Sequence, residues 1–301
     1  MRFISRLAFY LSAIAFFSII SFAQQNDVDK LPVNYEELTS PDFIKAVEKS
    51  NGTCIIPFGI LEKHGPHLPL GTDLLDAREK SIRAAQNEYV LVFPQYYFGQ
   101  IYEAKHQPGT IAYSSDIIWK MLQETCDELS RNGIKKIIIV NGHGGNNNFI
   151  KYFCQAQLEK RKDYVVIMYT PVGNPEVQKE ILKLRKTVDD DHAGETETSS
   201  ILAFRPDLVK LDKTSTQSGE DKKQLDGLHD FFAGIWWYAK FPNHYAGDGS
   251  PANKTLGDLI LNSDVDQLTK FIKSIKKENR LIDLQNKFFD EADEPLKTKV
   301  K

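Results

Sequence analysis

Short apolar runs alternate with longer amphipathic stretches over most of the chain. Runs rich in β-branched and aromatic residues predict buried strands at residues 53–60, 89–99, 134–140 and 163–171. Apolar residues recurring at helical spacing predict helices at residues 40–50, 72–87, 114–133, 149–162 and 254–277, and another helix resumes after residue 197. Residues 214–253 are rich in loop-forming and aromatic residues and carry no clear period.

The order of these elements predicts the fold class. Helices alternate with strands that are apolar almost throughout, and this is typical of an α/β sandwich whose mostly parallel sheet is covered on both faces. The chain shows no internal repeat and no long linker, so we expect one domain at residues 37–280. Residues 24–36 are interpreted as an N-terminal extension and residues 281–301 as a charged C-terminal tail.

The first 23 residues have the layout of a secretory signal peptide. Two arginines precede an apolar run from Leu7 to Phe22, and small residues stand at Ser21 and Ala23. The alternative is an uncleaved membrane anchor, but the run is shorter than the roughly 20 residues that span a bilayer. We therefore expect cleavage after Ala23, export to the periplasm or outside the cell, and no stable membrane association afterwards.

Charge and cysteine content narrow the classes of function. The formal charge of −3 becomes −5 when the two arginines of the leader are removed, so nothing favours nucleic acid or an anionic membrane as a partner. Three cysteines, Cys54, Cys126 and Cys154, lie in apolar or amphipathic runs. One disulfide is compatible with an exported protein, but buried free thiols are the default expectation.

Polar clusters follow the predicted strands. The segments "EKHGPHLPLGTD" (62–73), "HQPGT" (106–110) and "NGHGGN" (141–146) each come after a strand, at the edge where α/β proteins carry their chemistry. In "EKH", Glu62 and His64 point the same way in extended backbone and can converge on one point. Asp73 can turn back into the same space, although it also suits a helix N-cap.

Two further clusters carry histidine. His143 stands among glycines that let the backbone approach a ligand closely. A phosphate-binding loop is disfavoured, because the glycines do not match G-x-G-x-x-G and no GK[ST] follows. The segment "DDDHAGETETSS" (189–200) reads either as a solvated charge run or as a tight turn with one acid aimed inward, and its pattern does not say which acid.

The clusters together favour metal-dependent chemistry. Carboxylates and imidazoles from separate loops suit Zn²⁺, Mn²⁺ or related divalent ions. Five ligands with one carboxylate between them indicate two ions about 3.5–4 Å apart. No serine in a G-x-S-x-G context and no cysteine beside a histidine is present in the sequence, so covalent hydrolase chemistry is less attractive.

Four motifs in this order, "PFGILEKHGPHLPLGTD", "PGTI", "VNGHGGN" and "HAGETETS", resemble the creatininase (creatinine amidohydrolase) family over roughly residues 37–265. The resemblance implies a three-layer α/β/α fold and a metal-dependent hydrolase of amide or cyclic-amide C–N bonds. It also implies a homo-oligomer, often a hexamer, acting on a small-molecule amide with two divalent ions, Zn and/or Mn, or Fe.

The resemblance also assigns metal ligands. Glu62 and His64 resemble ligands of two different ions, Asp73 the carboxylate that bridges them, and His143 the ligand that completes the first ion. Creatininase itself supplies a glutamate to the second ion from the loop after this histidine, and Gly145 stands there in this chain. Members with "NGHGGN" use the acid of "ETS" instead, which points to Glu197 and makes creatinine a doubtful substrate.

His192 resembles the catalytic histidine of the family. In the mechanism that the resemblance implies, two cations lower the pKa of a bridging water, so that hydroxide attacks a polarised carbonyl. His192 would carry a proton to the leaving nitrogen. The alternatives are another metal hydrolase on the same site, such as a lactonase or a peptidase, and a non-catalytic periplasmic binding protein.

Four other residues are each open to two interpretations. His67 either orients a ligand or only holds the turn, and His106 either faces the substrate or fixes its loop. Trp236 and Trp237 suit a core or a subunit interface better than a substrate lid. Substrate specificity is expected to depend on the loop-rich residues 214–253.

Overall fold

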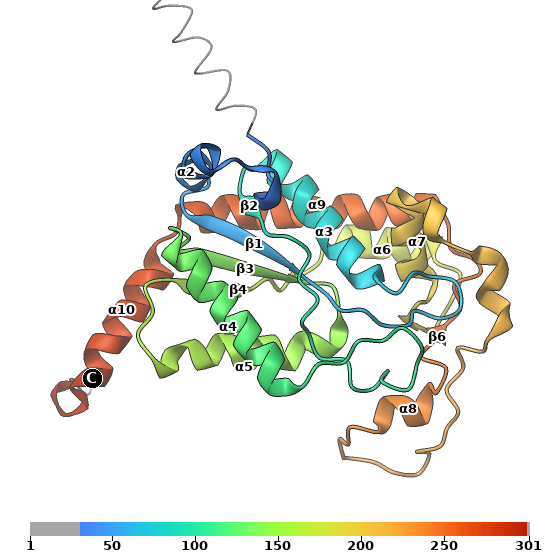
Figure 1. Cartoon of the computed structure of the whole chain (residues 1–301). Helices are drawn as coiled ribbons and strands as arrows, with labels where there is room; N and C mark the ends of the chain where they lie inside the picture. The colour runs from blue at the N-terminus through green and yellow to red at the C-terminus, as the bar shows by residue number, and fades with distance from the viewer. Residues whose placement is uncertain (1–30, 300–301) are drawn as a thin grey trace, which may run out of the picture.

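A computed structural model describes residues 31–299 of the protein, so the predicted signal peptide lies outside the described residues. Its main sheet has four strands in the order β2-β1-β3-β4, and every neighbouring pair is parallel (Figure 1). The strands are β1 (Thr53–Phe58), β2 (Leu91–Val92), β3 (Lys136–Asn141) and β4 (Val165–Met168). The predicted parallel sheet is confirmed.

The two central strands explain the almost unbroken apolar runs. In β1 and β3 successive side chains point to opposite faces, and both faces are buried. Ile56 and Ile139 join one hydrophobic cluster, whereas their neighbours Ile55 and Ile138 join the other. A run with no polar positions is therefore what a sheet covered on both sides requires.

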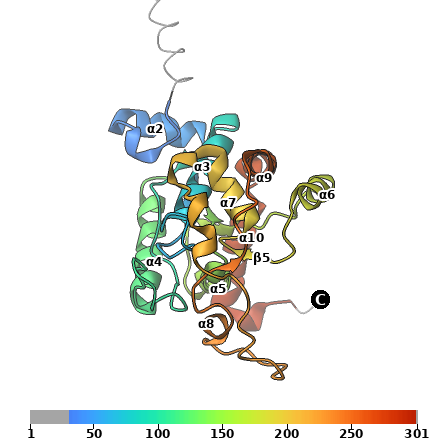
Figure 2. The same ribbon diagram turned by 90° about the vertical axis from the view of Figure 1, so that its right-hand side faces the viewer.

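Helices cover both faces of the sheet. Helices α4 and α5 pack on one face, and α3 and α9 pack on the other (Figures 1 and 2). The three-layer α/β/α architecture is confirmed. The helices are α2 (Ser40–Lys49), α3 (Thr72–Asn87), α4 (Ser115–Arg131), α5 (Asn147–Ala156), α6 (Pro175–Leu184), α7 (Glu195–Phe204), α8 (Trp236–Lys240), α9 (Lys254–Lys277) and α10 (Arg280–Asp293). Short 3₁₀ turns span Tyr35–Glu37, Gly144–Asn146, Gln157–Glu159, Pro206–Leu208, Leu211–Thr216 and Pro295–Lys297.

Several predicted elements are shorter in the structure. The strand expected at residues 89–99 is only two residues long, and an isolated parallel bridge between Phe58 and Tyr96 continues the pairing beyond Pro94. Proline lacks the N–H that a continuous ladder needs. The helix that begins at Glu195 ends at Phe204, just before Arg205, because a residue preceding proline disfavours helical backbone.

Three helices were not predicted: α6, α10 and the five-residue α8, which lies in the loop-rich residues 214–253. Helix α6 begins at Pro175 with Asn174 as its side-chain cap, a start signal that the sequence pattern contained. Helix α10 occupies much of the segment interpreted as a charged tail (Figure 1). It is tied to the domain by Gln285, whose side-chain amide donates to the backbone carbonyls of Lys162 and Tyr164. The proposed domain boundaries stay predictions.

A second, two-stranded sheet lies beside the main one. Strand β5 (Asp190–His192) pairs antiparallel with β6 (Ala246–Gly247). Helix α7, which follows β5, packs closely on α9: a Cβ at Gly257 would lie 1.8 Å from the carbonyl oxygen of Ser199. This close contact fixes α7, and with it the segment from His192 to Glu197, relative to the main sheet.

The three cysteines, all within residues 31–299, form no disulfide, and Cys54 and Cys126 are buried. This agrees with the expectation of buried thiols. Within the same described range, no helix combines the length and the apolar composition needed to cross a bilayer.

Candidate active site

Polar side chains from four segments converge at the carboxyl edge of the sheet. Three of these segments come directly after β1, β3 and β5, and the fourth leads into β6. Five of the predicted residues lie together there, in two groups of three whose ligand atoms lie within 4.8 Å of one another. The groups are Glu62, Asp73 and His143, and His64, Asp73 and Glu197.

Asp73 lies at the centre of this arrangement and belongs to both groups. Its Oδ1 is 2.9 Å from His64 Nε2, and its Oδ2 is 3.3 Å from His143 Nδ1. Although Asp73 is in the first turn of α3, the N-cap is Gly71, so the side chain is not a cap. A Cβ at Gly142 would lie 2.4 Å from the Asp73 carbonyl oxygen, and glycine there lets the end of β3 approach α3.

The two glutamates contact the histidines that Asp73 also contacts. Glu62 Oε1 is 2.8 Å from His143 Nδ1, and Glu197 Oε1 is 3.5 Å from His64 Nε2. The second oxygen of Glu197 accepts the backbone N–H of Ala193, which fixes the carboxylate at the start of α7. In the "DDDHAGETETSS" segment, Glu197 is therefore the acid that faces the cluster, although Glu195 is more deeply buried.

Two other acids of that segment hold the loop. Glu195 accepts the backbone N–H groups of Lys186 and Thr187 at 2.7 and 2.8 Å. Asp190 accepts the backbone N–H of Thr196 at the start of α7. These contacts use backbone donors, so the charge run is a built turn rather than a solvated face.

The carboxylates and imidazoles of the cluster shift one another's pKa values strongly. Burial opposes the ionised form of Glu62, but His143 and His192 outweigh it and hold the pKa of Glu62 well below its usual value. Burial likewise lowers the pKa of His143, yet Glu62 and Asp73 raise it to about 10. Burial of Glu197 is outweighed by His64, which brings the pKa of Glu197 to about 2. The cluster therefore strongly favours a cationic partner for its carboxylates.

The donor set fits divalent cations. Glu62 Oε1 and Asp73 Oδ2 are buried and have no hydrogen-bond partner among the described residues. Buried carboxylate oxygens in that state are unfavourable unless a cation satisfies them. Three carboxylates with two imidazoles also match the oxygen and nitrogen ligands that Zn²⁺ and Mn²⁺ accept.

His192 lies against this cluster. Its Nε2–H donates to the carbonyl oxygen of Lys63 at 2.9 Å, and its ring centre is 4.4 Å from that of His64. Burial lowers the pKa of His192, so the neutral ring is favoured. With Nε2 engaged as a donor, Nδ1 is the nitrogen that remains to accept a proton.

His67 supports the loop that carries His192. The Thr198 hydroxyl donates to the carbonyl oxygen of Ala193, so it accepts the Nε2–H of His67 at 2.8 Å. Burial lowers the pKa of His67 to about 4. Ala193 has a positive φ of 55°, an unfavourable conformation for a residue with a Cβ, and this chain of hydrogen bonds helps to hold it.

The three remaining predicted residues, His106, Trp236 and Trp237, differ in whether they reach the cluster. His106 is exposed, and its Nε2 hydrogen-bonds the Pro242 carbonyl oxygen, so it links two loops and does not reach the cluster. Trp236 and Trp237 do reach it: both line a pocket of about 520 Å³ that contains His143 and His192.

Two residues at the site were missed by the sequence reasoning. Glu103 lines the same pocket, with Oε1 3.9 Å from His143 Nε2 and Oε2 accepting from Gln100 at 2.7 Å. His244 contacts Glu62 directly. The only signal for Glu103 was an acid shortly before "HQPGT" in a loop predicted at the active edge. His244 carried no signal beyond its position in a loop.

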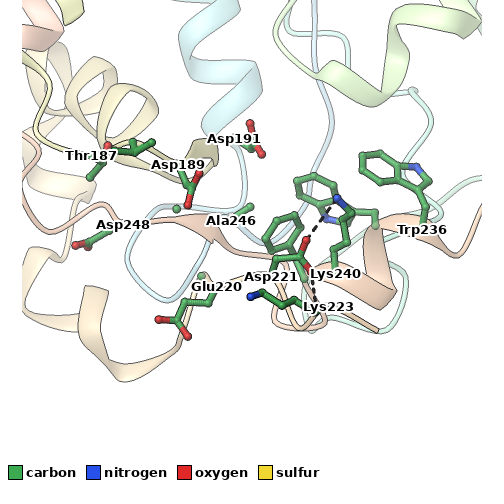
Figure 3. Close-up of a pocket in the computed structure, with 15 residues that line it drawn as sticks. Thr187, Asp189, Asp191, Glu220, Asp221, Lys223, Trp236, Lys240, Ala246 and Asp248 are labelled. Carbon is green, nitrogen blue, oxygen red and sulfur yellow. Dashed lines mark hydrogen bonds and ion pairs between the residues drawn. The ribbon is translucent and has the colours of Figure 1, made fainter. Parts of the chain in front are cut away.

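A second, larger pocket adjoins the first. It has a volume of about 1080 Å³ and shares Asp191, Trp236 and Trp237 with the pocket at the cluster. Figure 3 shows its polar lining, including Asp189, Asp248 and the ion pair of Lys240 with Asp221. The reaction site therefore opens toward further space lined mostly by acids and aromatic rings.

Comparison with known proteins identifies the family of the chain. The profile of the family described as "Creatininase: Creatinine amidohydrolase" matches residues 36–272. The chain is 29% identical over 191 residues to the creatinine amidohydrolase of Pseudomonas putida, covering 59% of this chain and 74% of that protein. It is 30% identical over 165 residues to the mycofactocin precursor peptide peptidase of Mycolicibacterium smegmatis, covering 53% of this chain and 60% of the peptidase.

Solved structures show the same fold. A creatinine amidohydrolase (creatininase) superposes with a TM-score of 0.70 at 24% identity, covering 82% of this chain and 99% of that one. A putative creatinine amidohydrolase from Bacteroides fragilis superposes with a TM-score of 0.67 at 23% identity, covering 83% and 98%. Because the family profile extends over most of the sequence, the chain belongs to the creatininase family.

Proposed function

We propose that the protein is a metal-dependent amidohydrolase that cleaves an amide or cyclic-amide C–N bond. The observation that carries the proposal is the pair of three-residue groups that share Asp73. Glu62, Asp73 and His143 would hold one divalent ion, and His64, Asp73 and Glu197 the other. This is the arrangement that the sequence motifs implied.

The metals would supply the Lewis acidity of the site. When bound, two divalent cations lower the pKa of water and polarise a substrate carbonyl. Solved creatininases include a Zn–Zn form and a Mn form. We propose Zn²⁺ and/or Mn²⁺ for this chain, because the mixed carboxylate and imidazole donors suit both ions.

His192 would transfer the proton that the reaction requires. Its Nε2–H is held by the Lys63 carbonyl, which fixes the ring, and Nδ1 can accept a proton and pass it to the leaving nitrogen. Its pKa is lowered by burial, so the ring starts in the neutral form that a base needs. The ring of Trp237, 5.9 Å from that of His192, helps to exclude water from the same side.

A specific observation favours a peptide or another extended amide as a second candidate substrate. The pocket at the cluster and the adjoining pocket of about 1080 Å³ share three lining residues, which gives room beyond a single small lactam. The relatives include both a creatinine amidohydrolase and a peptide peptidase. In addition, Gly145 replaces the glutamate that creatininase itself carries.

A hydrolysis screen tests the proposal. Purified protein is stripped with a chelator, reloaded with Zn²⁺ or Mn²⁺, and assayed on lactams, linear amides, short peptides and lactones. Metal-dependent cleavage of an amide supports the proposal, and cleavage of lactones alone would favour the lactonase alternative. A protein that holds metal and releases no product from any of them would instead support a binding protein.

We also propose that the protein acts outside the cytoplasm, because its first 23 residues have the layout of a signal peptide. N-terminal sequencing of the protein from its native host tests this. A mature chain that begins at Gln24 is the expected result; an intact Met1 would contradict cleavage, and an intact chain that fractionates with the cytoplasm would contradict export.

Finally, we propose a homo-oligomer, as the family resemblance implies. Phe232 and Ile235, in the segment that borders the pockets, are 80% and 59% exposed, and clustered apolar surface of this kind is typical of a subunit interface. Light scattering on the purified protein tests the assembly state, and a monomer at micromolar concentration would contradict it.

A further inference from the structure

A chain of hydrogen bonds joins the pocket wall to a predicted metal ligand. Trp237 Nε1 lies 2.9 Å from His244 Nδ1, and His244 Nε2 contacts Glu62 Oε2. An indole N–H can only donate, so His244 Nδ1 is the acceptor. In a neutral imidazole the other nitrogen then carries the proton, and His244 Nε2–H donates to Glu62.

These hydrogen bonds determine which oxygen of Glu62 is available to a metal ion. Oε2 is occupied by His244, whereas Oε1 faces His143 and His64 at 2.8 and 3.7 Å. The Glu62 side chain is fully buried, and Oε1 has no hydrogen-bond partner among the described residues. His244 therefore orients the carboxylate so that its free oxygen points to the cluster.

The backbone at His244 is constrained in the conformation that directs its side chain to Glu62. His244 is 2% exposed and has a positive φ of 51°, which is uncommon for a residue other than glycine. Its N–H donates to the Phe241 carbonyl, and its carbonyl accepts the N–H of Gly65. The latter bond ties His244 to the turn that carries Glu62 and His64.

We propose that Trp237 and His244 are positioning residues that orient Glu62 for metal binding. The proposal rests on the proposed function, in which Glu62 is a ligand. Residues that hydrogen-bond a metal ligand and fix its orientation generally contribute about 10–100-fold to metal affinity. Trp237 also lines the pocket. The same series of hydrogen bonds therefore connects the pocket wall, which would face the substrate, with Glu62, which would bind the metal.

Zn²⁺ affinity, measured by chelator competition on the full chain, tests the proposal. Trp237→Phe removes the indole N–H and keeps an aromatic ring, and we expect about tenfold weaker binding. His244→Asn tolerates the positive φ but is too short to reach Glu62, and we expect a loss of about 10–100-fold. Trp236→Phe is the matched control, because no hydrogen bond of its indole is found among the described residues, and its Zn²⁺ affinity should equal that of the unsubstituted protein.

The melting temperature of the metal-free variants separates positioning from folding. A loss of Zn²⁺ affinity in Trp237→Phe with a metal-free melting temperature equal to that of Trp236→Phe supports the proposal. Equal Zn²⁺ affinity in all the variants, or the same loss in Trp236→Phe, would overturn it. If the unsubstituted protein itself binds no Zn²⁺ or Mn²⁺, the proposed function fails, and the positioning role fails with it.

Discussion

Replacing Gly145 with alanine tests how closely the site is packed around His143. A Cβ at this position would lie 2.4 Å from His143 Nε2 and 2.8 Å from Glu103 Oε1. Ordinary contacts of this kind are about 3.5 Å, so the imidazole must move by about 1 Å. Glu103 can swing away, but the His143 ring is buried and its Nδ1 is held between Glu62 and Asp73.

The expected effect follows from that displacement. Metal–ligand distances are tolerated within about 0.2 Å, so a shift of about 1 Å removes His143 as an effective ligand. We expect affinity for the first ion to fall by about 100-fold, or about 2.7 kcal/mol. The metal-free fold should also weaken, by about 1–3 kcal/mol, because the displaced ring gives up its contacts with Glu62 and Asp73.

Gly144→Ala is the matched control. The same added methyl group meets nothing within 4 Å at that position, one residue away in the same loop. Zn²⁺ affinity of both variants is measured by chelator competition, together with the metal-free melting temperature. Equal Zn²⁺ affinity in Gly145→Ala and Gly144→Ala would refute the reasoning, since it would mean that His143 is free to move or is not a ligand.

Three further substitutions test other parts of the structure. Gly257→Ala places a Cβ 1.8 Å from the Ser199 carbonyl oxygen, and chemical denaturation should show a loss of about 1–3 kcal/mol; no loss would mean that α7 and α9 separate freely. Lys80→Met leaves the partly buried Asp76 and Asp264 without their ion-pair partner between α3 and α9. The same assay should show a loss of about 1–3 kcal/mol in the free energy of unfolding, and equal stability would mean that these ion pairs do not stabilise the fold. His192→Ala should keep its metal by elemental analysis and lose turnover by about 10²–10⁴-fold; unchanged activity would remove its role.

The sheet and the position of the site were predictable because both follow from local patterns. The buried strands at residues 53–60 and 134–140 are apolar almost throughout, and parallel strands bring their carboxyl ends to one edge. Glu62, His64 and His143 follow those strands within a few residues, so their convergence needs only the sheet, whereas Asp73 is brought back by the turn that leads into α3. The structure brings all four together there.

The residues that were missed depend on tertiary geometry. Glu103 reaches His143 only because Gly145 has no side chain, and a single sequence does not show that the two loops meet. His244 reaches Glu62 across 182 residues of sequence from a loop without regular period. The charge run alone did not indicate which acid faces the cluster, and only the motif resemblance pointed to Glu197, which the structure places beside His64.

The central claim is that Asp73 bridges two divalent ions in this chain, and metal stoichiometry tests it most directly. Elemental analysis of the purified protein, reconstituted with Zn²⁺ or Mn²⁺ and desalted, should give about two ions per chain for the unsubstituted protein. Asp73→Asn, which keeps the size of the side chain and removes its charge, should lose both ions. Two ions retained by Asp73→Asn, or no stoichiometric metal in the unsubstituted protein, would contradict the account.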